Sequence, residues 1–184
     1  MTSPLVLRLL VVNRAHVRPS MLQASEEDAE AIYGATGVQT RWANVTATDA
    51  SSDYAIDFIV IIVSGTESRL MAARQRDNVL GFASRESGIA WVLYDRVADN
   101  ATIHGVPFRR FFGQVIAHEV GHLLLPANSH SDHGIMQRGL STRPSLREYF
   151  TAAQAEMIRQ HVASLRCGQH ITCALQPLVP SMLP

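Results

Sequence analysis

Apolar and polar residues follow one another in blocks along the first half of the chain, and these blocks have the lengths of strands. Residues 4–12 (PLVLRLLVV) and 38–45 (VQTRWANV) predict two strands, the first of them buried and interrupted by Arg8. Residues 56–65 (IDFIVIIVSG) are the strongest candidate, because their continuous apolar run predicts a central strand covered on both faces. Residues 88–97 (GIAWVLYDRV) predict a further strand.

Helical spacing of apolar residues appears between the first two strands. Residues 20–37 predict an amphipathic helix that ends at Gly34 or Gly37. Its charged side is expected to be a solvated face, formed by Glu26, Glu27, Asp28 and Glu30. Residues 66–78 are polar and fit either a loop or a short helix.

A last helix is predicted over residues 151–165, with Thr151 as the N-cap and Gln154 at the capping-box position. The order of strand, helix, strand and strand at the start of the chain is the opening of an α/β layer fold. The length of 184 residues suits one compact domain.

The segment that carries chemistry is FFGQVIAHEVGHLLL, residues 111–125, which contains the pattern H-E-x-x-H. Residues four apart lie on the same face of a helix, so His118 and His122 can bind one metal ion. Glu119 lies beside that ion, where it can act as a general base towards a metal-activated water. Pro126 is expected to end the helix soon after the second histidine.

A catalytic zinc site usually has three protein ligands, so a third ligand is expected in residues 126–137 (PANSHSDHGIMQ). Imidazole is a much better zinc ligand than a carboxamide, which disfavours Asn128. Of the remaining candidates we favour His130, followed by His133 and then Asp132.

These residues together resemble the metzincin zinc peptidases. The resemblance rests on His118-Glu119-Val120-Gly121-His122, His130-Ser131 and Gly134-Ile135-Met136, where Met136 corresponds to the methionine of the turn beneath the metal. The fuller pattern of HEVGHLLL, NSHS and GIM resembles a group of small, uncharacterised bacterial proteins with predicted zinc peptidase activity.

The resemblance implies an α/β metzincin-like domain with a twisted, mostly parallel sheet, an edge strand over the cleft, an active-site helix and a C-terminal helix. It implies Zn²⁺ bound by His118, His122 and His130, with Glu119 as the catalytic base and a peptide or protein as substrate. The edge strand that pairs with substrate is expected in residues 88–97, where Trp91, Leu93 and Tyr94 would either line the cleft or pack in the core. The expected catalytic domain covers residues 1–175, followed by a tail of residues 176–184.

The chain departs from the metzincin pattern after the second histidine. That pattern has glycine and the third histidine at the positions of Leu125 and Asn128, so His130 comes two residues late. Pro126 favours a changed exit from the helix, because the residue before a proline is pushed out of the helical region.

Other functions stay open at this level. Glu148 or Glu156 on a later helix would be the third ligand if the site were of the gluzincin type. The chain could also be a catalytically inactive zinc-binding domain, or a protein-interaction domain whose histidine helix is simply core.

Charge and cysteine content limit the partners. Sixteen basic and sixteen acidic residues balance, which argues against a nucleic-acid binder, and no apolar run is long enough for a membrane span. We expect a monomer. A Cys167–Cys173 disulfide would indicate a secreted or periplasmic protein whose leader has been removed, whereas free thiols would fit the cytoplasm.

Overall fold

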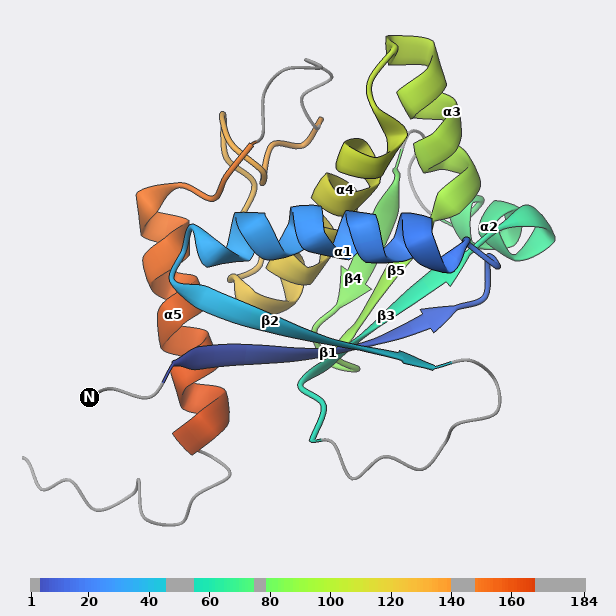
Figure 1. Ribbon diagram of the computed structural model, residues 1–184. Coiled ribbons are helices and arrows are strands. Elements are labelled where there is room, and N and C mark those ends of the chain that lie inside the picture. Colours follow the sequence, from blue (N-terminus) through green and yellow to red (C-terminus); the bar gives the residue numbers. More distant parts are fainter. Residues whose placement is uncertain (1–3, 46–54, 75–78, 140–147, 168–184) are drawn as a thin grey trace, which may run out of the picture.

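A five-stranded sheet forms the centre of the computed structural model, which describes residues 4–45, 55–74, 79–139 and 148–167. In chain order the elements are β1 (Leu5–Asn13), α1 (Pro19–Gly34), β2 (Val38–Val45), β3 (Phe58–Val63), α2 (Gly65–Ala72), β4 (Gly81–Ser84), β5 (Ile89–Leu93), α3 (Tyr94–His104), α4 (Phe108–Leu124) and α5 (Ala152–Cys167). The strand order is β2-β1-β3-β5-β4, and only β4 runs antiparallel to its neighbour (Figure 1). The predicted single α/β domain with a mostly parallel sheet is confirmed.

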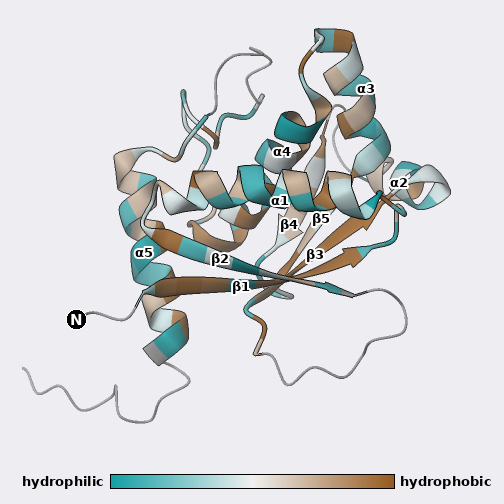
Figure 2. Ribbon diagram, viewed as in Figure 1, coloured by the Kyte–Doolittle hydropathy of each residue, from teal (hydrophilic) through white to brown (hydrophobic). Residues whose placement is uncertain are grey.

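One face of the sheet carries the main core, because α1 and α4 lie together on that side (Figure 1). Burial alternates along the strands that face these helices: Leu7, Leu9 and Val11 of β1 are buried. The strongly apolar β3, brown in Figure 2, follows the same alternation, with Val60 buried and Ile61 half-buried. The predicted central position of β3 is confirmed. Its second face is covered at the carboxyl end, where Val63 and Ile61 pack with Ala72 of α2 in a smaller cluster, and is only half-buried at Ile59.

The close crossing of α1 and α4 depends on a glycine. A Cβ at Gly113 would lie 2.5 Å from the backbone oxygen of Ser25 on α1. Next to this contact, the buried Asp28 forms an ion pair with Arg109 at 3.1 Å. Glu26 is also buried, so the prediction of a solvated acidic face is correct for Glu27 and Glu30 but wrong for Glu26 and Asp28, which the packing of α1 covers.

The strand predicted over residues 88–97 is shorter than expected, and it lies inside the sheet and not at its edge. β5 ends at Leu93, and the following residues begin α3. β5 pairs with β3 on one side and β4 on the other, so the edge strand on this side of the sheet is β4 and not β5, and the opposite edge is β2. Four residues with the sequence GFAS are too short to show a strand periodicity, which explains why the sequence did not indicate this edge.

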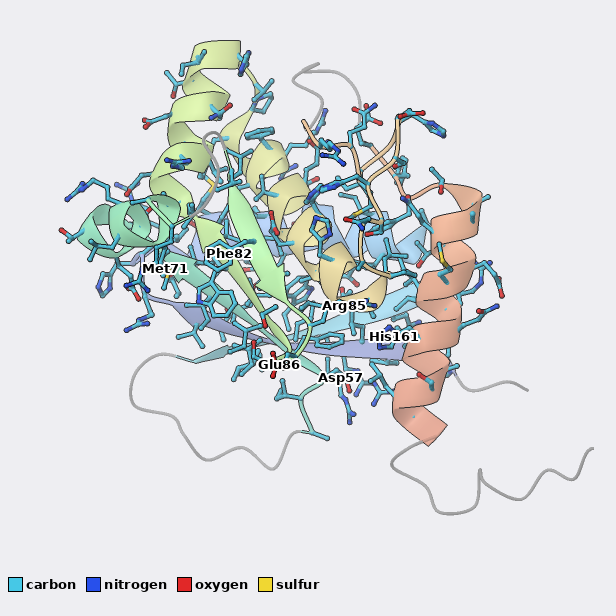
Figure 3. All side chains as sticks on the ribbon, turned by 180° about the vertical axis from the view of Figure 1, so that it is seen from behind. Asp57, Met71, Phe82, Arg85, Glu86 and His161 are labelled. Atoms are coloured by element: carbon cyan, nitrogen blue, oxygen red, sulfur yellow. The ribbon has the colours of Figure 1, made fainter. Side chains whose placement is uncertain are left out.

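The three residues expected at the cleft or in the core, Trp91, Leu93 and Tyr94, lie in different surroundings. Leu93 is buried, and Tyr94 packs edge-on against Phe112 of α4. Trp91 is half-buried and stacks on Phe82 of β4, with ring centroids 4.9 Å apart (Phe82 is labelled in Figure 3).

The C-terminal helix α5 follows the prediction closely. Thr151 N donates to Gln154 Oε1 at 3.0 Å and Gln154 N donates to Thr151 Oγ1 at 3.3 Å, which is the predicted capping box. Near its other end, Arg166 binds the buried Asp57, which also pairs with Arg8 of β1 (Figure 3 labels Asp57). Cys167 is the last residue of α5, but its side chain, Cys173 and the tail of residues 176–184 lie outside what the structure describes, so the predicted disulfide is not tested. In the described ranges, we find no helix whose length and apolar character would let it cross a bilayer.

Candidate metal centre

Helix α4 brings the sequence motif into the interior of the protein. Nearly all of its residues from Phe111 to Leu124 are buried, including His118 and Glu119, which are 7% and 5% exposed. The helix ends at Leu125, whose extended backbone (φ −97°, ψ 158°) precedes Pro126. The predicted helix and its stop at the proline are confirmed.

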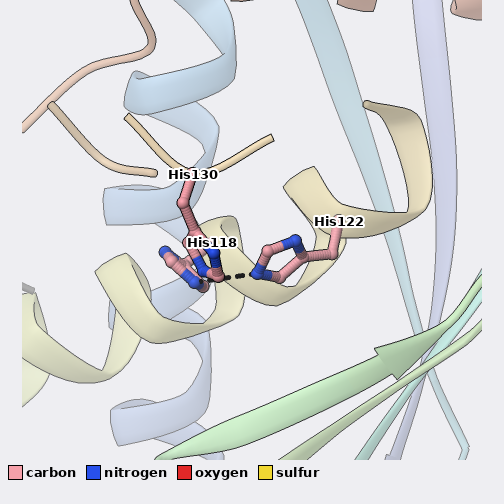
Figure 4. Close-up of side chains that lie close together, drawn as sticks. All are labelled: His118, His122 and His130. Atoms are coloured by element: carbon pink, nitrogen blue, oxygen red, sulfur yellow. Dashed lines mark hydrogen bonds between the residues drawn. The ribbon is translucent and has the colours of Figure 1, made fainter. Parts of the chain in front are cut away.

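Three imidazoles converge at this part of α4. The side chains of His118, His122 and His130 each offer a ring nitrogen, and these nitrogens all lie within 4.8 Å of one another (Figure 4). The Nε2 atoms of His118 and His122 are 3.0 Å apart. The ring of His130 approaches from the loop after α4, with its centroid 4.7 Å from that of His122.

The tautomer of His118 is set by a backbone carbonyl. Its Nδ1 lies 2.7 Å from Ile135 O, which can only accept, so Nδ1 carries the proton and Nε2 of the neutral ring presents its lone pair. Ile135 N in turn donates to Tyr149 O at 2.9 Å. This arrangement of a ligand nitrogen backed by a fixed acceptor is typical of metal-binding histidines.

All three rings are held in the neutral form that a metal requires. Burial, together with the charge of His130, lowers the pKa of His118 to about 4, against a smaller opposing effect of the hydrogen bond to Ile135. Burial, followed by the charges of His118, His130 and Arg85, lowers the pKa of His122 to about 3. Partial desolvation and the charge of Arg138 also lower the pKa of His130.

The other candidate ligands do not join this cluster. Among the described residues, the grouping of possible metal-binding side chains contains His130 but neither His133 nor Asp132, both of which are exposed. Asn128 adopts a left-handed backbone (φ 60°), exposed at the turn that leads to His130. This turn accommodates the two additional residues before the histidine.

The glutamates of the gluzincin alternative also lie apart from the cluster. Neither Glu148 nor Glu156 is in the grouping found among the described residues. Glu156 is exposed and pairs with Arg159 of the same helix.

Glu119 lies against the edge strand. A Cβ at Gly81 of β4 would be 2.7 Å from Glu119 Cγ, so only a glycine leaves room for this side chain. Burial raises the pKa of Glu119 to about 8, and its Oε2 has no hydrogen-bond partner within the described part of the chain. A buried carboxyl oxygen without a partner, on the residue that directly follows His118, fits a group that interacts with something bound at the site.

Met136 packs beneath the helix that carries the histidines. It is fully buried, and a Cβ at Gly121 would lie 2.7 Å from its Sδ atom and 3.0 Å from Phe150 Cε1. The glycine between His118 and His122 therefore lets the methionine and the ring approach α4 closely.

The donor set fits a zinc ion. Three neutral imidazole nitrogens match the number and type of protein ligands in catalytic zinc sites. Glu119, whose Oε2 has no hydrogen-bond partner in the described part of the chain, follows His118 directly on α4.

Several residues around the cluster carried no signal in the sequence. Arg85 and Arg138 place positive charge near His122 and His130, as their effects on the histidine pKa values show. Gly81 provides space for Glu119, and Gln154 makes contacts beyond its predicted cap. Apart from the effect of Arg138 on His130, these depend on contacts between segments that are distant in the sequence.

Comparison with known proteins supports the fold. No protein-family model matches the sequence, and no curated protein matches it. The structure of archaemetzincin from Methanopyrus kandleri is similar, with a TM-score of 0.55 and 14% identity, over 88% of this chain and 98% of the other. A zinc-dependent peptidase from Methanocorpusculum labreanum (strain Z) is similar with a TM-score of 0.53 and 14% identity, over 82% of this chain and 99% of the other.

A third structure, metalloproteinase-II from Bacteroides fragilis, has a TM-score of 0.50 and 13% identity, over 86% of this chain and 53% of the other. At these identities the similarity concerns the fold. The chain therefore has the α/β fold of zinc-dependent peptidases, and the resemblance to metzincin-like enzymes is confirmed at that level.

Proposed function

We propose that the protein is a zinc-dependent endopeptidase. The observation that supports this most strongly is the convergence of three imidazole nitrogens within 4.8 Å, beside a buried carboxyl group, in a fold shared with zinc peptidases. His118, His122 and His130 would hold the ion. Bound zinc would supply a Lewis acid that polarises the scissile carbonyl and lowers the pKa of a water molecule.

Glu119 is the proton carrier in this proposal. Its carboxyl group is buried, and burial raises its pKa to about 8, which makes the carboxylate a stronger base than that of an exposed glutamate. A zinc ion bound nearby would favour the ionised form that accepts a proton. It accepts the proton of the attacking water and then delivers it to the leaving amine. The close contact with Gly81 fixes the side chain between helix and edge strand.

The edge strand β4 suggests how a peptide would bind. It is the last strand of the sheet in the described structure, so its outer backbone groups are available for pairing with an extended chain. Backbone pairing recognises the polypeptide with little dependence on sequence. A peptide or protein substrate is therefore the class that this site fits.

Met136 has a supporting role in the proposal. Its fully buried side chain lies against Gly121, between the two histidines of α4, and corresponds to the methionine of the metzincin turn. It would keep the floor of the site apolar and closely packed.

The test is cleavage of an unfolded protein by zinc-loaded wild type and by Glu119→Gln, with both proteins assayed for bound zinc. We expect internal cleavage products from the wild type, and a rate lower by about 10²–10⁴-fold in the variant at equal zinc content. Zinc binding without cleavage by the wild type would instead indicate an inactive zinc-binding domain. Equal rates for the two proteins would contradict the role of Glu119.

A further inference from the structure

Of the three histidine side chains, that of His130 is held by the fewest contacts. It is exposed and lies on the loop between α4 and α5, whereas His118 is buried on a helix and its ring is held by Ile135 O. In the described part of the chain, no hydrogen bond to the His130 side chain is present. Its position near His122 must therefore come from the way its own backbone is held.

A buried side chain from α5 binds the residues on both sides of His130. Gln154 is 5% exposed, and its Nε2 donates to Ser129 O at 3.0 Å and to Ser131 Oγ at 3.2 Å. These two acceptors belong to the residues immediately before and after His130. The oxygen of the same amide accepts from Thr151 N, so this one side chain both caps α5 and binds the loop.

The contacts continue from Ser131 into the methionine segment. Ser131 N donates to Met136 O at 3.0 Å, and Ser131 Oγ donates to His133 O at 2.8 Å. The loop from Ser129 to Met136 thus forms one hydrogen-bonded unit, and Gln154 attaches that unit to α5.

We propose that Gln154 is a positioning residue that holds His130 where it can bind zinc. The inference rests on the proposed zinc site. The Gln154 amide donates to acceptors on either side of His130 and so restricts the segment, which reduces the conformational entropy lost when the ring binds an ion. We call the two hydrogen bonds from Gln154 to Ser129 and Ser131 the clamp. The clamp also explains how a histidine that comes two residues later than in the metzincin pattern still reaches the other two rings.

The variant Gln154→Glu separates the two roles of this side chain. A glutamate has the same shape and still accepts from Thr151 N, but it has no N–H to donate and directs an oxygen at Ser129 O. We expect its dissociation constant for zinc, measured by chelator competition, to rise by about 10–100-fold. Thr151→Ala is the matched control, because it removes the other half of the cap and leaves both contacts of Gln154 to the loop. It should lower Tm and leave the zinc dissociation constant unchanged.

A double-mutant cycle shows whether Gln154 acts through His130. In a His130→Ala background, Gln154→Glu should weaken zinc binding no further, because the ligand that it positions is already gone. Ser131→Ala, a milder change that removes one acceptor of the clamp, should weaken binding in the same direction and serves if Gln154→Glu folds poorly.

Unchanged zinc affinity in Gln154→Glu and Ser131→Ala would overturn the inference. An equal loss with and without His130, or an equal loss in Thr151→Ala, would also overturn it and indicate a general structural effect. In these cases wild-type zinc binding and the dependence of cleavage on Glu119 would still stand. A wild type that binds no zinc would overturn the proposed function together with the clamp.

Discussion

Glu119 and Gly81 are in contact at a distance that allows no side chain on the second residue. A Cβ at position 81 would lie 2.7 Å from Glu119 Cγ, 2.8 Å from Glu119 Cδ and 2.5 Å from Trp91 O. The edge strand and the proposed catalytic base are thus packed as one unit, because a glycine is present where they meet.

Gly81→Ala should consequently impair catalysis more than zinc binding. The added methyl group must displace either the carboxylate or the strand, and misplacement of a reacting group by about 1 Å can lower a rate on the order of 10²-fold. The measurement is kcat for cleavage, with zinc content determined on the same sample. Gly34→Ala is a matched control, since no atom lies within 4 Å of its added Cβ. A kcat equal to that of the wild type would contradict the assigned contact.

Gly113→Ala should destabilise the fold. Alanine normally stabilises a helix relative to glycine, by roughly 0.5–1 kcal/mol. Here the methyl group would lie 2.5 Å from Ser25 O, so α1 and α4 must separate. We expect a net loss of about 1–3 kcal/mol in the free energy of unfolding, measured by urea denaturation. A gain in stability, as expected for Gly34→Ala, would show that the helices do not cross this closely.

Asp57→Asn should loosen the attachment of α5 to the sheet. The carboxylate is 2% exposed and binds Arg8 at 3.0 Å and Arg166 at 2.7 Å. An amide retains one acceptor and turns an N–H₂ group towards a guanidinium. The partial exposure of both arginines reduces the effect through solvent screening, so we expect a loss of about 1–3 kcal/mol in denaturant unfolding. Glu156→Gln, which alters an exposed pair, should change stability little, and an equally small effect of Asp57→Asn would contradict the assigned role.

Glu26→Gln should stabilise the protein in a pH-dependent manner. Burial, opposed in part by the hydrogen bond from Asn44, raises the pKa of Glu26 above its ordinary value of 4.5. The folded chain therefore retains a proton that the unfolded chain releases, and wild-type stability falls as pH rises from 4.5 through the folded pKa. Glutamine removes this loss, so the variant gains stability over the wild type with rising pH.

The measurement compares urea unfolding of both proteins near pH 4 and near pH 7.5, because all other titrating groups are shared. The stability difference should be larger at the higher pH. A difference that is the same at both pH values would show that Glu26 titrates normally.

The predictable parts of the fold were those with a strong local pattern. The apolar runs of β1 and β3, the helical spacing of α1 and the proline after α4 each gave the correct element within a few residues. The capping box at Thr151 and Gln154 was also correct, because both of its partners lie within one turn of helix.

The errors arose where long-range packing decides the outcome. Asp28 is buried where α4 crosses α1, and the buried Glu26 accepts a hydrogen bond from Asn44 of β2. The four residues of β4 form an edge strand because β5 is there to pair with them. The second set of contacts of Gln154 could not be predicted either, since it joins α5 to a loop 25 residues away.

The most direct test of the account is the zinc content of the purified protein after zinc has been supplied, determined by elemental analysis for the wild type and for His118→Ala, His122→Ala and His130→Ala. We predict about one zinc per wild-type chain and a marked loss in each variant. Zinc retained in full by His130→Ala would transfer the third position to His133 or Asp132, and a wild type without zinc would contradict the proposed metal centre.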